Sequence, residues 1–343
     1  MGMQDQLIQE ASVTAWLAER TEIEQPLTFE LIAGGRSNMT FTVTDAHGRR
    51  FVLRRPPMGP LLPSAHDMAR EHRLMHSLAD SDVPVPMMVG LCQDEAVNGR
   101  DFYVMDFMDG VVVRDVEIGR EFNERTRRLM SESLVDTLCA LHRVGIDSVG
   151  LGDLAKREGY IERQLRRWSS QWEKSKTREL PLIETVAATL AARAPVQGEA
   201  TIAHGDYRLS NCMMEPTGAV MAVLDWELCT LGDPMADLGL LICYWHDPSD
   251  LEPTGDAETT GLAGFMTQGE MAARYAAEMG VDLTSVDYYT AFAHWRLACI
   301  GEGVYARYVG GQQGSQDEEL DLDSMRDAVT RSAGVAADLL GIG

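Results

Sequence analysis

The sequence lacks several features that would assign the protein to a particular class. No uninterrupted apolar run reaches the roughly 18 residues of a membrane-spanning helix. The six cysteines are far apart and include no C-x-x-C pair, which favours buried free thiols over disulfides or a metal site. The first residues, MGMQDQLIQEAS, carry acids and do not resemble a secretory signal. These absences predict a cytoplasmic protein that does not enter a membrane.

Positive charge is also scarce. The 343 residues include 53 acidic and 30 basic side chains, which gives a formal net charge of −23. Nucleic acids and anionic membrane surfaces are bound by basic faces, so this balance argues against both as partners. The 45% of hydrophobic residues are enough for a sizeable core, and the length suits one large domain or two lobes.

The pattern of apolar residues changes near residue 108. Before it, a helix over residues 5–19 is followed by short strand-like segments and one further helix, in the order β-β-β-α-β-β. After it, helical periodicity dominates, apart from short strands within residues 201–227. The sequence therefore predicts an α+β, two-lobed protein. We expect a small β-rich lobe over 1–108 and a larger, mainly helical lobe over 109–343.

Residues 201–227, TIAHGDYRLSNCMMEPTGAVMAVLDWE, contain a dense group of polar side chains. Asp206 follows His-Gly, Asn211 comes five positions later, and Asp225 and Glu227 end an apolar run. Phosphoryl transfer needs an acid that orients the attacking hydroxyl and oxygen ligands for Mg²⁺. An Asp, four residues and an Asn, with a second Asp on the next hairpin, is the arrangement found in protein kinases. We expect Asp206, Asn211 and Asp225 to face one cleft; the alternative is that Asp206 merely caps a turn.

The longer pattern, HGDYRLSN with VLDWELCTLGDPMADLG, resembles the aminoglycoside phosphotransferase and choline kinase family. GGRSNMTF, FVLRRPP and RQLRRW are most similar to the phosphotransferase-like segment fused to some acyl-CoA dehydrogenases. The resemblance implies a bilobal protein-kinase-like fold that uses ATP or GTP with Mg²⁺. Residues 1–108 would then be the nucleotide-binding lobe, and residues 109–343 would carry the catalytic loop and the acceptor site. The resemblance also implies that Asp206 is the catalytic base, that Asn211 and Asp225 are metal ligands, and that Glu227 assists them.

The Gly-rich stretch GGRSN lies where a phosphate-covering hairpin belongs in this family. Gly34 and Gly35 would allow backbone N–H groups to approach phosphate oxygens, and Ser37 and Asn38 would add further donors. On its own the stretch indicates only a turn.

The rest of the predicted nucleotide site comes from three further segments. Kinase-like folds carry a Lys in a V-A-I-K pattern, and here FVLRR places Arg54 at that position, a planar fork instead of a point charge. Glu71 in the following helix would pair with Arg54, or else be a solvated helix residue. YVMDFMDG resembles the hinge, where the backbone from Met105 to Phe107 would bind the adenine edge.

The acceptor is the part that the sequence determines least. Arg163, Arg166 and Arg167 form a basic cluster, which would suit an anionic acceptor such as a hydroxyacyl-CoA-like compound, or be a solvated helix face. The candidates for the pocket wall are Arg163, Trp168, Trp172 and Tyr244. The alternative is that Trp168, Trp172 and Trp295 are core residues, the commoner role of aromatics at helical spacing.

The leading hypothesis is an ATP- or GTP- and Mg²⁺-dependent kinase of a small-molecule hydroxyl. The alternatives are an aminoglycoside kinase and a catalytically weak nucleotide-binding pseudokinase, which only the missing Lys supports. In GDPMADLG, Asp233 and Asp237 are expected to cap and anchor the next helix. Oligomeric state has no signature in the sequence.

Overall fold

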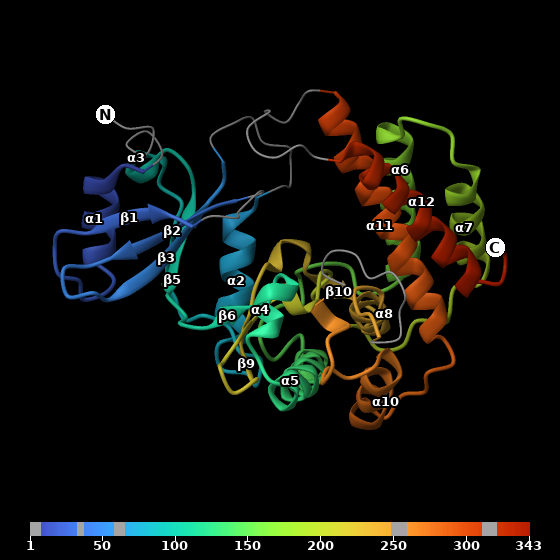
Figure 1. Ribbon diagram of the computed structural model, residues 1–343. Coiled ribbons are helices and arrows are strands. Elements are labelled where there is room, and N and C mark those ends of the chain that lie inside the picture. Colours follow the sequence, from blue (N-terminus) through green and yellow to red (C-terminus); the bar gives the residue numbers. More distant parts are fainter. Residues whose placement is uncertain (1–7, 33–37, 58–65, 248–258, 311–320) are drawn as a thin grey trace.

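The structure is a computed structural model that describes residues 8–32, 38–57, 66–247, 259–310 and 321–343. It has a β-sheet lobe at one end and a helical lobe at the other (Figure 1). The sheet lobe is built on a five-stranded antiparallel sheet in the order β1-β2-β3-β5-β4. Its strands are β1 (Thr28–Leu31), β2 (Met39–Thr44), β3 (Arg50–Arg55), β4 (Met88–Cys92) and β5 (Phe102–Asp106).

Alternation of apolar and polar residues explains how the sheet is covered. In β2, Phe41 and Val43 are buried while the threonines between them are half-buried, as expected for a strand with one face on a core. Helix α1 (Glu10–Ala18) packs Val13 and Leu17 onto that face. A helix was expected over 5–19, of which residues 5–7 lie outside the described part of the chain. The short α3 (Glu95–Asn98) was not expected; Asp94 caps its first turn.

Helix α2 (Met68–Leu78) lies between the sheet and the helical lobe (Figure 1). Its N-cap is Asp67, which accepts a hydrogen bond from the Arg70 N–H. The apolar side chains of α2, including Leu74 and Met75, belong to the same core cluster as the helical lobe. The Arg70 guanidinium also donates to the Cys229 carbonyl, 2.7 Å away, in that lobe. Helix α2 is therefore attached to both lobes.

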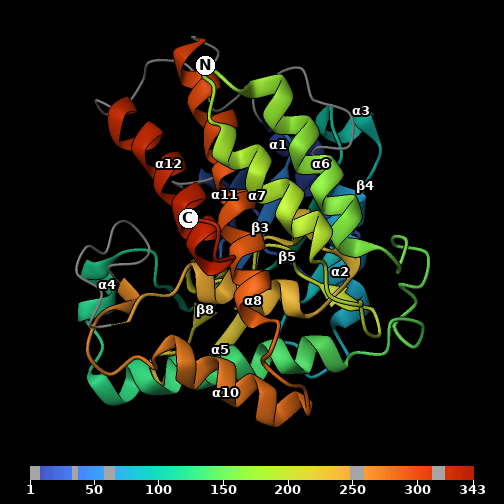
Figure 2. The ribbon, with the colours of Figure 1, turned by 90° about the vertical axis from the view of Figure 1, so that its right-hand side faces the viewer.

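The helical lobe has two layers. Helices α6, α7, α11 and α12 pack around one core cluster, and α5 and α10 pack against each other beneath the strands (Figure 2). Its helices are α4 (Val116–Arg120), α5 (Glu124–Arg143), α6 (Tyr160–Ser175), α7 (Pro181–Ala192), α8 (Met235–Cys243), α10 (Gln268–Met279), α11 (Val286–Val309) and α12 (Leu322–Leu339).

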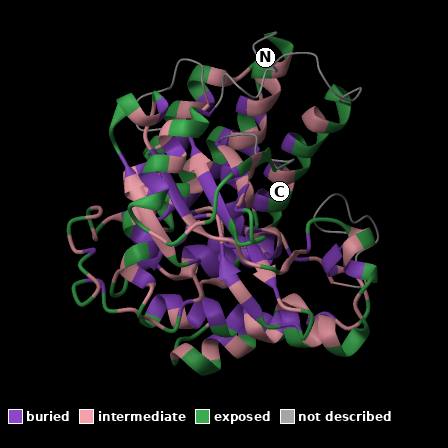
Figure 3. Ribbon diagram, turned by 90° about the vertical axis from the view of Figure 1, so that its left-hand side faces the viewer, coloured by how far each residue is buried: buried purple, intermediate pink, exposed green. Residues whose placement is uncertain are grey.

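Two small sheets include the strands of residues 201–227. β7 (Thr201–Ala203) pairs with β10 (Thr230–Gly232), and β8 (Cys212–Met214) pairs with β6 (Val111–Val112) and β9 (Val220–Val223). The short 3-10 helices η2 (Leu209–Asn211) and η3 (Trp226–Leu228) connect them. Buried residues, purple in Figure 3, concentrate in this central region. The chain thus places its acidic motifs in the loops and turns that directly follow short strands in the middle of the molecule.

The expected α+β, two-lobed architecture is confirmed, with the strand and helix order of the first lobe interrupted only by α3. The boundary at residue 108 stays a prediction; it falls in the connection between β5 and β6. Among the described residues, no helix is both long and apolar enough to cross a membrane.

Candidate active site

The HGD loop directly follows β7 and is held from two sides. Both carboxylate oxygens of Asp237, on α8, accept backbone N–H groups: that of His204 at 2.7 Å and that of Gly205 at 2.8 Å. From the other side, the buried guanidinium of Arg296, on α11, donates to the Gly205 carbonyl. Gly205 has a φ of 81°, and a Cβ there would lie 2.6 Å from the Leu228 carbonyl oxygen. These contacts and the limited space at Gly205 fix the backbone path of the HGD loop.

Asp206 and Asn211 are in direct contact. The Asn211 Nδ2 donates to Asp206 Oδ2 and to the Asp206 carbonyl, each at 2.8 Å. This leaves Asn211 Oδ1 without a hydrogen-bond partner in the described part of the chain. Burial raises the pKa of Asp206, although Arg208 and Arg296 partly oppose the rise. Arg208 Nε lies 3.6 Å from Asp206 Oδ2, so it pairs with an acid of the loop.

Asp225 is fixed next to this loop through its neighbour Leu224. The His204 ring donates from Nε2 to the Leu224 carbonyl at 2.9 Å, and the Leu224 N–H donates to the Asn211 carbonyl at 2.9 Å. Asp225 itself adopts the left-handed conformation, with φ of 62° and ψ of 63°, which is rare for a residue other than Gly. The structure thus brings Asp206, Asn211 and Asp225 to one place.

Arg54 connects Asp225 with Glu71. Its Nε lies 3.2 Å from Glu71 Oε2, and its Nη2 donates to Asp225 Oδ1 at 3.0 Å. Burial works against the charged guanidinium, but Tyr103 and the two carboxylates hold the pKa of Arg54 above its ordinary value. Arg54 therefore lies where the sequence placed the missing Lys, and it contacts both acids at once.

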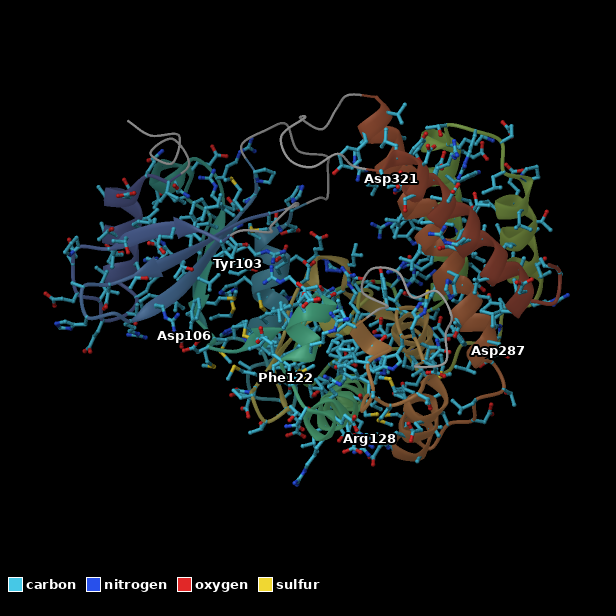
Figure 4. The ribbon with its side chains drawn as sticks, viewed as in Figure 1. Tyr103, Asp106, Phe122, Arg128, Asp287 and Asp321 are labelled. Carbon is cyan, nitrogen blue, oxygen red and sulfur yellow. The ribbon has the colours of Figure 1, made fainter. Side chains whose placement is uncertain are left out.

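Glu71 is a buried anchor and not a solvated helix residue. Its Oε1 accepts from Asn38 Nδ2 at 3.1 Å, its Oε2 accepts from the Tyr103 hydroxyl at 3.0 Å, and the same Oε2 forms the ion pair with Arg54. Tyr103, labelled in Figure 4, lies opposite Arg54 in the strand register, where β5 passes α2. Asn38 also contacts the His66 ring through Oδ1, at 2.7 Å from Nδ1.

The predicted phosphate loop is visible only at its end. The amide nitrogen of Asn38, which we expected to face the phosphates, is directed to Glu71 instead. Gly34, Gly35 and Ser37 lie outside the described residues.

The donor set fits a magnesium ion that is shared with nucleotide phosphates. Burial and the neighbouring Asp225 and Glu71 raise the pKa of Glu227 to about 7, which shows that carboxylates crowd this part of the site. Asn211 Oδ1 is a further oxygen without a partner among the described residues. Within those residues, no three His, Cys, Asp or Glu side chains form a complete metal cage. Mg²⁺ commonly binds through one or two carboxylates plus phosphates, which is compatible with this arrangement.

A pocket of about 370 Å³ opens between the lobes beside these acids. Arg54, Glu71 and Asp225 line it on one side and Met105 and Phe107 on another. The N–H of Phe107 is already bound to the Arg50 carbonyl at 3.3 Å. Asp206, Asn211 and Glu227 lie outside this lining, and the wall residue Leu224 is hydrogen-bonded to Asn211, which contacts Asp206.

Two guanidinium groups, one of them that of Arg296 at the HGD loop, lie over the same aromatic ring. Arg167 lies 5.0 Å and Arg296 5.8 Å from the centroid of the Trp168 ring. Arg167 is exposed at the surface and has no carboxylate partner in the described ranges. Partial burial of its guanidinium together with repulsion from Arg296 lowers the pKa of Arg167. Arg208 similarly covers the ring of Tyr244 at 4.8 Å. In a protein of net charge −23, this is a locally positive region.

Other predicted pocket residues have structural roles. Arg163 donates to the carbonyls of Lys156, at 2.7 Å, and Leu231, at 3.1 Å, and so ties α6 to neighbouring loops. Trp172 and Trp295 are buried in the helical core.

Sequence reasoning missed Arg296 and Tyr103 as site residues. No local motif marks Arg296, because its contact with Gly205 joins segments 91 residues apart. Tyr103 could have been found if the pairing of β3 with β5 had been predicted, because that pairing sets it opposite Arg54.

Comparisons with known proteins agree with this geometry. Residues 28–275 match the model of a family described as phosphotransferase enzymes. The mouse protein named acyl-CoA dehydrogenase family member 10 is 37% identical over 287 residues, which is 82% of this chain and 26% of that protein. The chain thus spans about a quarter of the length of that relative.

Solved structures share the whole architecture. A candidate aminoglycoside phosphotransferase from Ralstonia eutropha is 32% identical, with a TM-score of 0.80 over 96% of this chain and 98% of that one. The aminoglycoside phosphotransferase APH(2'')-Ib with bound ADP is 15% identical, with a TM-score of 0.60 over 96% of this chain and 99% of that one. At that identity the second likeness concerns the fold alone.

Proposed function

We propose that the chain, which belongs to the phosphotransferase enzyme family, transfers the γ-phosphate of ATP or GTP to a hydroxyl of a small molecule and uses Mg²⁺ to do so. Family and fold make it a small-molecule phosphotransferase. One observation carries the finer proposal: hydrogen bonds run from Asp206 through Asn211 to Leu224 and so set the loop acid beside Asp225.

Asp206 is the proposed catalytic base. Its Oδ2 accepts from the Asn211 amide, and Oδ1 has no hydrogen-bond partner in the described part of the chain, so that oxygen would accept the hydroxyl of the acceptor. Burial raises the pKa of Asp206 and so makes its carboxylate a better proton acceptor near neutral pH. Orientation of the hydroxyl for in-line attack is the main task of such a residue in phosphoryl transfer.

Asn211, Asp225 and Glu227 are the residues that would hold Mg²⁺, which would supply charge neutralisation at the phosphates. Arg54 would contact the phosphates from the sheet side of the pocket. Gly34, Gly35 and Ser37 remain proposed phosphate-loop residues, and the hinge from Met105 to Phe107 remains the proposed adenine site.

The acceptor that suits Arg167 and Arg296 is a hydroxy compound that carries negative charge. Arg167 and Arg296 repel each other and lie over the same ring of Trp168, so an anionic group placed between them would relieve that repulsion. A hydroxyacyl-CoA-like compound has both the hydroxyl and the negative charge. The mouse relative is named as an acyl-CoA dehydrogenase family member, which is consistent with an acyl-CoA as acceptor.

Two alternatives have specific support. The name of the Ralstonia structure suggests an aminoglycoside acceptor, but a polycation would meet the positive Arg167 and Arg296. The Arg at position 54 suggests a pseudokinase, although Asp206, Asn211 and Asp225 are all present and in contact through one network.

A screen of acceptors with γ-labelled ATP and GTP tests the proposal. Hydroxyacyl-CoAs should be phosphorylated in the presence of Mg²⁺, and aminoglycosides and choline-like alcohols should not. The Asp206→Asn variant should lose about 100-fold or more in kcat, the range typical of general-base removal, while nucleotide affinity changes little. Full turnover by this variant would refute the assignment of the base, and turnover of aminoglycosides alone would favour the alternative.

The role of Arg167 can be tested with a matched neighbour. Arg166 is an exposed arginine on the same helix with no contact to Trp168 in the described structure. Arg167→Gln should raise the KM for an anionic acceptor about tenfold, the usual scale for one lost charge contact, and Arg166→Gln should not change it. Equal effects of the two substitutions would contradict a direct role for Arg167.

A further inference from the structure

Arg54 joins the two lobes at the nucleotide pocket through two ion pairs. It belongs to β3 of the sheet lobe, whereas Asp225 follows β9 in the helical lobe, 171 residues later. Its Nε contacts Glu71 at 3.2 Å while its Nη2 contacts Asp225 at 3.0 Å. The second contact occupies an oxygen of the carboxylate that would also hold Mg²⁺.

The two ion pairs are not equivalent. The side chain of Glu71 is 3% exposed and accepts hydrogen bonds from Tyr103 and Asn38. Separation of Arg54 from Glu71 would therefore leave buried charges without a partner. The side chain of Asp225 is 32% exposed, and Arg54 is its only ion-pair partner among the described residues. An ion pair open to water is weak and easily replaced. The contact with Asp225 is therefore the one that can give way.

We infer that Arg54 is an inter-lobe clasp that holds Asp225 in the nucleotide-free protein and releases it when a divalent cation binds. The inference rests on the proposed function, because the cation site is the same. A guanidinium and a divalent cation repel each other and compete for Asp225 Oδ1. Once released, Nη2 is available to phosphate oxygens while Nε stays on Glu71. Arg54 thus raises the Mg²⁺ concentration that nucleotide binding requires.

The substitution of Arg for Lys has a physical consequence in this scheme. A guanidinium is a rigid, planar fork that presents separate N–H donors to two carboxylates. An ammonium group is a compact point charge on a flexible stem, and the buried, hydrogen-bonded Glu71 would hold it more firmly than the half-exposed Asp225 would. A Lys at position 54 would therefore leave Asp225 open to the cation.

The test measures Mg²⁺ dependence of nucleotide binding and not only turnover. Isothermal titration with a non-hydrolysable ATP analogue is carried out at a series of MgCl₂ concentrations for the wild type and Arg54→Lys. The Mg²⁺ concentration for half-maximal nucleotide affinity should be about tenfold lower in Arg54→Lys, which corresponds to about 1.4 kcal/mol. An unchanged Mg²⁺ requirement in a folded Arg54→Lys protein would overturn the inference.

A matched control uses another two-donor ion pair. Arg274, on α10, contacts Asp136, on α5, through Nε at 2.7 Å and Nη2 at 2.8 Å, away from the pocket. Arg274→Lys should leave the Mg²⁺ requirement at the wild-type value. A shift equal to that of Arg54→Lys would mean that loss of any such pair produces the effect, and the inference would fail.

A second measurement needs no variant at position 54 to fold. Crystal structures of the wild type with EDTA and with Mg²⁺ plus the analogue should differ in one contact: Nη2 of Arg54 should leave Asp225 only in the second. Persistence of the 3.0 Å contact between Arg54 and Asp225 would overturn this inference but would leave the proposed function standing. Absence of nucleotide binding by the wild type at any Mg²⁺ concentration would instead refute the proposed function, and the inference with it.

Discussion

Replacement of Asp237 by Asn tests whether one buried carboxylate determines the position of the catalytic loop. The two oxygens of Asp237 accept the backbone N–H groups of His204 and Gly205, and His142 Nε2 lies 3.3 Å from Oδ2. Burial disfavours the charge, but the hydrogen bonds from His142 and Gly205 outweigh it and keep the pKa of Asp237 below its ordinary value. The residue is therefore an anion that three donors hold in place.

The magnitude follows from the loss of one acceptor. Asn has the shape of Asp but only one oxygen, so its NH₂ group must face one of the two backbone N–H donors. A buried donor without a partner costs about 1–3 kcal/mol, and the remaining bonds lose their charge assistance, so the loss of stability should be about 3 kcal/mol. For a protein of 343 residues, whose unfolding entropy is about 0.7 kcal/mol/K, that corresponds to a fall in Tm of about 4 °C.

The same substitution should reduce turnover more than nucleotide affinity. His204 and Gly205 immediately precede Asp206, so a displaced loop moves the proposed base away from the acceptor hydroxyl. Misplacement by about 1 Å can cost 100-fold in rate. We expect kcat to fall about 10- to 100-fold while the nucleotide Kd, measured by titration, stays within about threefold, because the pocket wall is formed elsewhere.

Asp233→Asn is the matched control, since this acid is also buried at the start of α8. It accepts from the Tyr289 hydroxyl at 2.6 Å and from the Met235 N–H at 3.1 Å. A hydroxyl can reverse its role and accept from the new NH₂ group, so the cost should stay below about 1 kcal/mol. If Asp237→Asn melted within about 2 °C of the wild type, or no lower than Asp233→Asn, the anchoring argument would be wrong.

Two further predictions concern stability. Burial lowers the pKa of His294 to about 4, so between pH 6.5 and 4 the unfolded chain binds a proton that the folded protein does not. The free energy of unfolding should therefore fall by about 2 kcal/mol from pH 7.5 to 5. Urea titrations of the His294→Gln variant should lack that part of the fall. A Cβ on Gly239, in α8, would lie 2.5 Å from the Tyr289 backbone, so Gly239→Ala should cost at least about 2 kcal/mol in thermal unfolding. Gly334, inside α12, has nothing within 4 Å, and Gly334→Ala should stabilise by about 0.5–1 kcal/mol; equal effects of the two alanines would contradict the packing argument.

Local spacing in the sequence was enough to predict which central residues come together. Asp206 and Asn211 are five residues apart on one short loop, and the hairpin of β8 and β9 returns the chain to Asp225, so few long-range contacts are needed. Asn38 shows the limit of such reasoning. Its position after two glycines indicates a phosphate donor, but whether a side chain at the start of a strand turns outward or toward a neighbouring helix depends on tertiary packing.

Amphipathic periodicity predicted only in part which helical residues are buried. In α5, leucines 129, 134, 138 and 141 form an apolar set at helical spacing, yet Leu129 is 41% exposed while the other three are fully buried. The short elements β6, β8, β10 and α4 have two to five residues each, too few for a period to be visible. Arg296 required knowledge of how α11 crosses the HGD loop, which no local pattern contains.

The placement of α2 has a practical consequence for dissecting the protein. Leu74, Met75 and Leu78 are buried with the helical lobe although they lie within the first hundred residues. A fragment that stops at residue 108 would present these side chains to water, and the complementary fragment would lack the helix that seals its core. Separately expressed halves should aggregate, whereas the same halves produced in one cell should recover solubility by assembling with each other.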